Sequence, residues 1–217
     1  MHGASCGAIA AHAPKCHNDP MTPLLIAALL SIPATVSRTG IPYLPDDKAG
    51  PPDLVNTIRA RRPGGKLLNL DRMLLHSPNF AKGWNGMFAA IRKELALPAK
   101  LREIPILVIA VLNKAEYEWV QHEPEFRSAG GTSEQLAALR NPEAAGKDEK
   151  LFSDVERAAL ALTIEMTNKV AVQDATLKRI RALLPDQQVV ELIGTIAGYN
   201  MVSRFLVATG VDAEGER

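Results

Sequence analysis

The sequence predicts an all-α fold, a single helical bundle domain with an N-terminal extension. From about residue 52 onward, apolar residues recur at the three- and four-residue spacing of helices that bury one face. Prolines and glycines fall between these periodic segments, and several segments begin with residues that cap helices. No segment alternates apolar and polar residues over the length of a strand. At 217 residues, the chain suffices for one domain with a sizeable core.

The first predicted helix begins near Pro52 and is ended by the turn Pro63-Gly64-Gly65. A short apolar helix follows over residues 68–75. Ser77 and the proline after it form a strong start signal, because serine caps helices and proline suits the first helical position. The helix that they open is expected to run to Leu95.

A strongly apolar core helix is expected after Pro98. We place its start close to Leu101, because Pro105 is tolerated only near the first turn of a helix. Asn113 favours a break, since asparagine adopts the left-handed conformation that ends helices. Another helix is predicted over residues 115–128, before a glycine pair.

The last third of the chain continues the pattern. Capping boxes predict helices that start after Thr132 and after Ser153. Between these helices, residues 141–150 are polar and charged and are expected to form an exposed loop. Asp174 is expected to cap a further helix, and the last long helix is predicted to span residues 186–209 and to end at a glycine.

Residues 1–38 are expected to form a leader outside the folded domain, which would span residues 39–217. They lack periodic apolar positions and capped helices. The apolar segment 21–37 has the length of a signal-peptide core, but Pro33 interrupts it and no clean cleavage site follows. A cytoplasmic location is therefore expected, with export through this segment, or an upstream start codon, as the alternatives.

The charge balance and the cysteines exclude several classes of function. Net charge is +1, which gives no electrostatic reason to expect nucleic acid or a membrane as partner. The two cysteines, Cys6 and Cys16, lie outside the expected domain, so thiol catalysis and a disulfide framework are excluded within it. They are not paired as C-x-x-C, so together with His2, His12 and His17 they match no zinc pattern.

Three ionisable residues stand out as candidate catalytic groups. Glu118 and His122 are four residues apart and would share one face of a helix. Glu103 sits at the beginning of the apolar core helix. We expect all three to form one hydrogen-bonded cluster, in which a carboxylate keeps the imidazole charged as a proton donor. The alternative is structural: a surface glutamate–histidine pair, and a first-turn glutamate favoured by the helix dipole.

Two segments of the chain resemble a known family. KLREIPILVIAVLNKAEYEWVQH is similar to the signature of the carboxymuconolactone decarboxylase and alkylhydroperoxidase-D (AhpD) superfamily, and ELIGTIAGYNMVSRF resembles its last core helix. In the peroxidase branch, a glutamate precedes C-x-x-C and a histidine. Those positions fall here on Glu103, Ala115, Glu118 and His122, so this chain resembles a branch without the redox cysteines.

The resemblance implies an AhpD-like helical bundle that assembles as a trimer or hexamer. It implies a lyase of the carboxymuconolactone decarboxylase type, which acts by general acid/base catalysis on a small carboxylated lactone or aromatic-catabolism acid, with no metal or organic cofactor. Glu103, Glu118 and His122 would be catalytic. Two alternatives stay open: an AhpD-like protein that has lost its C-x-x-C, and a non-catalytic oligomeric binding protein. The residues expected to bind the substrate are Arg102, Tyr117, Tyr199 and Arg204.

Overall fold

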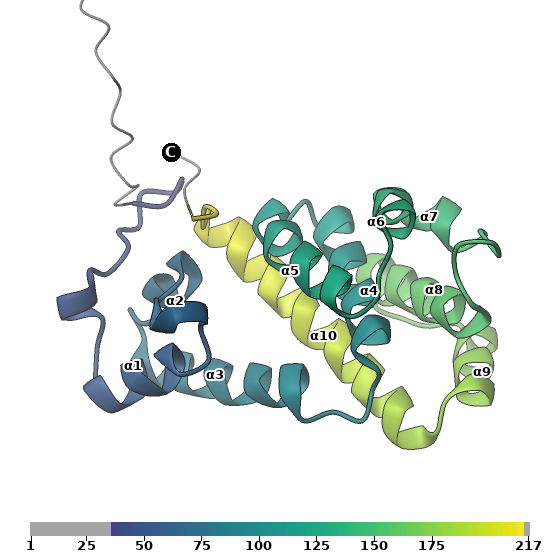
Figure 1. The fold of residues 1–217 in the computed structure, drawn as a ribbon, viewed down its shortest axis with the longest axis horizontal. Coiled ribbons are helices and arrows are strands. Elements are labelled where there is room, and N and C mark those ends of the chain that lie inside the picture. The colour runs from purple at the N-terminus through teal and green to yellow at the C-terminus, as the bar shows by residue number, and fades with distance from the viewer. Residues whose placement is uncertain (1–35, 215–217) are drawn as a thin grey trace, which may run out of the picture. The chain divides into compact units, whose positions relative to one another are not determined.

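The computed structural model describes residues 36–214, and helices dominate this part of the chain (Figure 1). Its only β pairing within these residues is an isolated bridge between Val36 and Pro42. The α-helices are α1 (Pro52–Arg59), α2 (Asn69–Leu74), α3 (Pro78–Lys93), α4 (Ala99–Leu112), α5 (Glu116–Ser128), α6 (Ser133–Leu139), α7 (Pro142–Ala145), α8 (Asp154–Lys169), α9 (Asp174–Leu183) and α10 (Asp186–Thr209). The prediction of an all-α fold is therefore confirmed for the described residues.

Helix α4 lies at the centre of the bundle. It packs against α5, α8 and α10, and the long α10 also contacts α5, α8 and α9 (Figure 1). This position explains the apolar composition of α4, because a helix surrounded by others buries its whole circumference. Five of its apolar side chains are completely buried: Ile104, Ile106, Leu107, Val108 and Ile109.

The buried apolar residues form two clusters, and α4 contributes to both of them. Trp84 belongs to the cluster that also includes residues of α3 and α10, and Trp119 belongs to the cluster that includes residues of α6 and α8. Both indoles are buried, as expected for large aromatic residues in a core. The two tryptophans therefore anchor different parts of the bundle.

The ends of α4 differ slightly from the prediction. The helix begins at Ala99, two residues before the expected start, and Pro105 lies inside it. Proline has no N–H to donate, but packing on all sides keeps the helix continuous. The break after α4 is confirmed, although Lys114 takes the left-handed conformation (φ 56°), whereas Asn113 stays at φ −92°.

Both predicted capping boxes are present. The Thr132 hydroxyl accepts a hydrogen bond from the Gln135 backbone N–H at 3.1 Å, and the Ser153 hydroxyl accepts one from the Glu156 N–H at 3.4 Å. The expected loop 141–150 is partly wrong, because Pro142 and the three residues after it form the short helix α7. Pro142 and Ala145 are buried, which makes this turn of helix part of the domain.

The folded part begins earlier than expected. Ser37 is buried, and the backbone N–H of Arg38 donates to the Gly210 carbonyl at 3.0 Å. The start expected at residue 39 is therefore too late. The rest of the expected leader, including both cysteines and most of segment 21–37, lies outside the described residues. None of the helices in residues 36–214 is long and apolar enough to cross a membrane.

Candidate functional site

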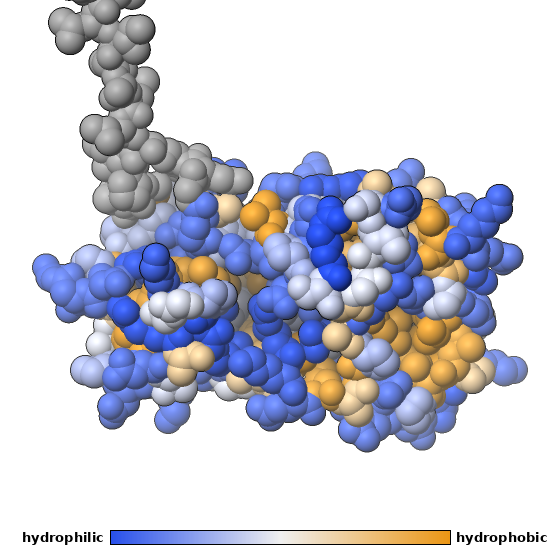
Figure 2. Space-filling model, in the orientation of Figure 1, coloured by the Kyte–Doolittle hydropathy of each residue, from blue (hydrophilic) through white to orange (hydrophobic). Residues whose placement is uncertain are grey.

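A small pocket lies beside two of the predicted catalytic residues, Glu118 and His122 of α5. We call it the site pocket; its free volume is about 50 Å³. Figure 2 shows apolar surface in the hollow between α2 and α5, with hydrophilic residues around it. Four stretches of the chain line the pocket: the α1–α2 connection with the start of α2 (Arg61, Arg62, Leu68, Leu70), α3 (Trp84, Phe88, Arg92), α5 (Tyr117, Glu118, Gln121, His122) and α10 (Tyr199, Val202, Leu206).

The His122 imidazole lines the site pocket and is hydrogen-bonded, on its other side, to the buried carboxylate of Glu103. Its Nδ1 lies 2.7 Å from Oε2 of Glu103, and the Glu103 side chain is completely buried. A carboxylate only accepts hydrogen bonds, so Nδ1 must carry the proton. Nε2 is then a base when the ring is neutral and a donor when the ring is protonated.

Arg102 supports the carboxylate from its other side. Its Nε donates to Oε1 of Glu103 at 3.1 Å. Burial opposes ionisation, but the hydrogen bond and charge of His122, with the charge of Arg102, hold the pKa of Glu103 below its usual value. Glu103 is therefore a negative ion that orients the imidazole. Its side chain does not itself line the pocket.

Glu118 has a different environment from the one predicted. Its side chain lines the pocket, yet neither carboxylate oxygen has a hydrogen-bond partner among the described residues. Burial raises the pKa of Glu118 well above its usual value. The expected three-residue cluster is therefore wrong in this part: Nδ1 of His122 is hydrogen-bonded to Glu103 on α4, and Glu118 makes no hydrogen bond to either residue.

Two tyrosines line the same pocket. The ring of Tyr199 meets the His122 imidazole edge-on, with centroids 5.0 Å apart, and its burial raises the phenol pKa. The Tyr117 hydroxyl donates to Oε1 of Glu214 at 3.2 Å, and burial again raises the pKa well above its usual value. Both phenols are therefore neutral donors at physiological pH.

The two predicted substrate-binding arginines lie elsewhere. Arg102 pairs with Glu103 and borders a neighbouring cavity, not the site pocket. Arg204 is an exposed residue of α10 whose Nη1 donates to the Asn200 carbonyl at 2.9 Å. Its side chain folds back along its own helix, so the structure does not place it against a ligand in the pocket.

Sequence reasoning missed three arginines that line the pocket. Arg62 forms a two-point ion pair with Asp71 at 2.9 and 2.6 Å, and Arg92 pairs with Glu125 at 2.7 Å. Arg61 donates from Nη1 to the Asn85 carbonyl at 2.8 Å. The available signal was the basic run at the end of α1, but basic residues at a helix C-terminus are ordinarily explained by the helix dipole.

The described residues contain no group of three or more histidine, cysteine or acidic side chains arranged to hold a metal ion. What they offer is an unpaired carboxyl, an oriented imidazole, two phenols and several guanidinium groups around an apolar space. These are the components of proton transfer to a small, polar-ended molecule.

The described residues thus form an all-α bundle with a buried glutamate–histidine pair beside a small pocket. Residues 78–165, which include Glu103, Glu118 and His122, match the Carboxymuconolactone decarboxylase family. This match covers less than half of the chain. No curated protein sequence matches it significantly.

Solved structures share the fold. An uncharacterized peroxidase-related protein from Silicibacter sp. TM1040 superposes with a TM-score of 0.70 at 17% identity, over 86% of this chain and 96% of that one. An uncharacterized peroxidase-related protein from Ralstonia eutropha JMP134 gives 0.68 at 17% identity, over 80% and 93%. The debrominase Bmp8, in complex with 2,3,4-tribromopyrrole, gives 0.67 at 18% identity, over 79% and 90%.

Proposed function

We propose that this protein is a lyase of the carboxymuconolactone decarboxylase type, which removes carbon dioxide from a small carboxylated, unsaturated lactone or a related acid by proton transfer. One observation carries the proposal. An unpaired buried carboxyl, that of Glu118, and an imidazole oriented by Glu103, that of His122, line the same small pocket.

The reaction needs an acid and an electrophilic contact. When a carboxylate is attached to the saturated carbon next to a double bond that is conjugated with a lactone carbonyl, the bond to carbon dioxide breaks and its electron pair moves through the double bond to the carbonyl oxygen. The dienolate that forms must be stabilised at oxygen and then protonated at carbon. The pocket has donors for the first task and a neutral carboxylic acid for the second.

Glu118 is the better proton donor in this scheme. Its raised pKa keeps the proton on the carboxyl at neutral pH, and no hydrogen bond within the described residues holds that proton elsewhere. In this scheme His122 and Tyr199, whose rings are in contact at the pocket lining, donate to the developing oxyanion. After the proton moves from Glu118 to carbon, solvent reprotonates the carboxylate and completes the cycle.

The thiol peroxidase alternative lacks its nucleophile. The resemblance puts its two cysteine positions on Ala115 and Glu118, and the only cysteines of the chain are Cys6 and Cys16. A thiolate is the group that peroxide oxidises reversibly in such enzymes. A non-catalytic binding protein would use the same pocket, but it would not require an acid held in its neutral form.

The decisive experiment is a turnover screen in D₂O against carboxylated lactones and aromatic-catabolism acids. We expect carbon dioxide release, with one deuterium incorporated at the protonated carbon of the product. Glu118→Gln keeps the shape of the side chain and removes its acidic proton. Unchanged turnover in this variant would contradict the proposal, and binding without turnover across the screen would favour the non-catalytic alternative.

We also propose that the protein self-associates. Large apolar side chains are exposed along α3 and α10, where Phe80 is 45% exposed and Val190 is 69% exposed. Monomers rarely leave many such residues facing water. We expect light scattering at micromolar concentration to give a trimer or hexamer mass; a monomer mass would contradict this proposal.

A further inference from the structure

We propose that Arg61 is the anchor for an anionic group that the ligand retains through the reaction, most simply a second carboxylate. The assignment rests on the proposed function, because it concerns which end of the substrate faces the acid. It depends on three features of the structure: the unneutralised charge of Arg61, the cavity into which the pocket opens, and the separation of Arg61 from Glu118.

The first feature is charge. The other arginines at this end of the pocket have carboxylate partners, since Arg62 pairs with Asp71 and Arg92 pairs with Glu125. None of the ion pairs among the described residues includes Arg61. Its Nη1 is held by Asn85, a neutral side chain and carbonyl, while its Nε is buried without a hydrogen-bond partner.

A buried donor without a partner is costly, so Arg61 is the guanidinium that gains most from an incoming anion. Asn85, which is itself buried on α3, holds the guanidinium in place without neutralising it. Burial and the neighbouring charge of Arg62 lower the pKa of Arg61, but a guanidinium remains protonated at physiological pH. Position and charge are both consistent with a preformed anion-binding group.

The second feature is the cavity next to the site pocket, which we call the arginine mouth. Its free volume is about 250 Å³. It shares Arg61, Arg62 and Arg92 with the site pocket, so the two spaces adjoin there. Five basic residues and one acidic residue line it, and this excess of positive charge would attract anionic ligands. The lining residues are Arg61, Arg62, Pro63, Leu68, Arg92, Lys93, Arg102, Gln121 and Glu125.

The third feature is separation. Arg61 comes from the connection after α1, whereas Glu118 lies on α5, and only burial contributes to the raised pKa of Glu118. A guanidinium close to that carboxyl would have lowered its pKa. We therefore assign Arg61 and Glu118 to two different ends of the ligand, in a pocket whose lining also includes apolar side chains such as Trp84 and Leu206.

This polarity determines how a substrate would lie. A carboxylate bound to Arg61 would be stabilised as an anion, and that interaction would oppose its loss as neutral carbon dioxide. The group that leaves must therefore be at the Glu118 end, and the group at Arg61 must survive in the product. Arg61 lies outside the segment 78–165 that matches the family. We therefore expect the anion anchor to affect which substrate this particular chain selects.

The test compares two small probes of nearly equal shape, 2-furoate and furan-2-carboxamide, by calorimetry or NMR titration. We expect the full-length protein to bind the carboxylate at least about 10-fold more tightly than the amide, the scale of one charged hydrogen-bond pair. Arg61→Gln should bring the preference to within about twofold. Arg61→Lys keeps the charge but loses the fork of donors, and it should retain part of the preference.

Lys93→Gln is the matched control, because Lys93 is an exposed cation of the same mouth. It should change the preference by less than about threefold. Absence of a preference in the wild-type protein, a preference that survives in Arg61→Gln, or an equal loss in Lys93→Gln would each overturn the assignment. If Arg61→Gln fails to fold, Arg61→Lys replaces it in the test. A preference of Arg61→Lys for 2-furoate equal to that of wild type would then overturn the assignment.

Glu118→Gln separates this inference from the proposed function. The variant should keep the preference for 2-furoate, because the anchor holds the other end of the ligand. If Glu118→Gln keeps its turnover while Arg61→Gln loses the preference, the lyase mechanism is wrong and the anion site stands. Loss of the preference in Glu118→Gln would overturn the separation of the two ends.

Discussion

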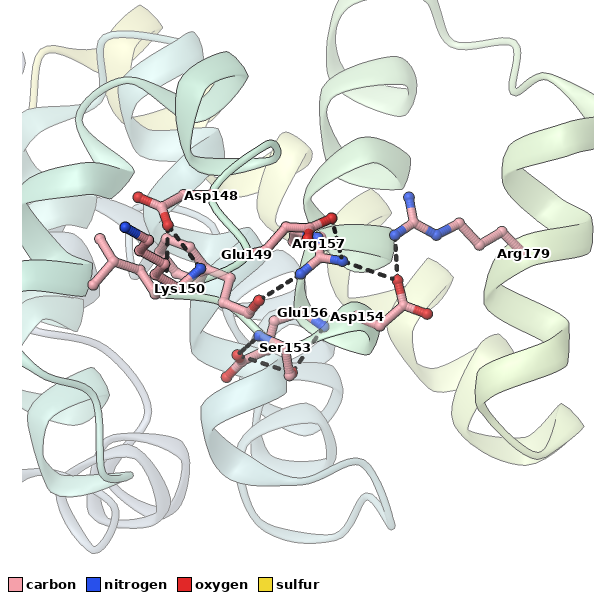
Figure 3. A network of polar contacts seen from close by, with 10 residues as sticks. Asp148, Glu149, Lys150, Ser153, Asp154, Glu156, Arg157 and Arg179 are labelled. Atoms are coloured by element: carbon pink, nitrogen blue, oxygen red, sulfur yellow. Dashed lines mark hydrogen bonds and ion pairs between the residues drawn. The ribbon is translucent and has the colours of Figure 1, made fainter.

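Ion pairs occur in two contrasting regions of this protein, at the beginning of α8 and around the site pocket. At the beginning of α8, Asp154 pairs with both Arg157 and Arg179, and Ser153 and Glu156 complete a capping box (Figure 3). Asp154 is half-exposed, so water competes with the two arginines for its carboxylate. Behind the pocket lining, Glu103 is completely buried, and a few fixed partners replace water.

The two regions differ in how completely their polar groups are paired, and this difference indicates which polar groups serve function. The α8 network holds a helix end with groups that are paired or hydrated, and each member is replaceable. The carboxylate of Glu103 behind the pocket is paired, whereas that of Glu118, which lines the pocket, has no hydrogen-bond partner among the described residues. An unpaired buried group lowers the stability of the fold. We therefore infer that Glu118 is retained for its function.

The largest difference is expected in turnover. Glu118→Gln and His122→Asn should each lower kcat by about 100-fold or more, the scale of general acid catalysis. Asp154→Asn should leave kcat unchanged, because its network does not reach the pocket. Steady-state kinetics on the substrate found in the screen would measure this. Equal losses in all three variants would remove the contrast between the two regions.

Stability should respond strongly to Glu103→Gln. Removing the buried charge leaves His122 and Arg102 without their anionic partner, which should cost about 3 kcal/mol at pH 7. The pKa of Glu103 is lowered by folding, so its contribution is complete above the unfolded value of 4.5 and is lost as pH falls through the lower folded value. Urea unfolding at pH 7 and below pH 4 should show the difference between the proteins shrinking.

His122→Asn should also destabilise the fold, since it leaves Glu103 buried without one of its partners. This outcome differs from a purely catalytic role for His122, in which stability would change little. An unfolding free energy equal to that of the wild type would indicate that the Glu103–His122 hydrogen bond contributes little in solution. The turnover of the variant would then report on proton transfer alone.

Glu118 should show the opposite pH dependence from Glu103. Its folded pKa is raised, so unfolding releases a proton, and stability falls as pH rises from about 4.5 up to the folded pKa. Glu118→Gln removes this slope, so the variant should gain on the order of 1–3 kcal/mol relative to wild type as pH rises above about 4.5. Parallel stability curves for the two proteins would show that Glu118 is ionised or paired in solution.

The smallest effect is expected at the α8 network. Asp154→Asn should change the free energy of unfolding by less than about 1 kcal/mol, and added salt should reduce the change further. The matched comparison is Glu103→Gln, whose effect should depend little on salt because the pair is shielded from solvent. A large, salt-independent effect of Asp154→Asn would show that the surface network is as important to the fold as the buried pair.

The sequence by itself determined the helices and most of their ends. Apolar spacing, prolines and capping boxes act within a few residues, so Thr132, Ser153 and the glycine after α10 could be interpreted locally. The pairing of Glu103 with His122 was also predicted, because a turn after α4 brings the two helices together. Local sequence signals fail where burial in the tertiary structure overrides them. Helix α7, for example, forms within a polar stretch that the sequence predicts to be a loop.

The set of groups that share the pocket depends on how the helices pack. Glu118 is one helical turn from His122, but the imidazole pairs with the carboxylate on α4, and that choice depends on how α4 and α5 pack. Arg61 reaches the same pocket from a connection far away in sequence, while Arg204 turns back onto α10. Spacing along a helix fixes which residues are neighbours, and the packing of helices fixes which of them lose water and find partners.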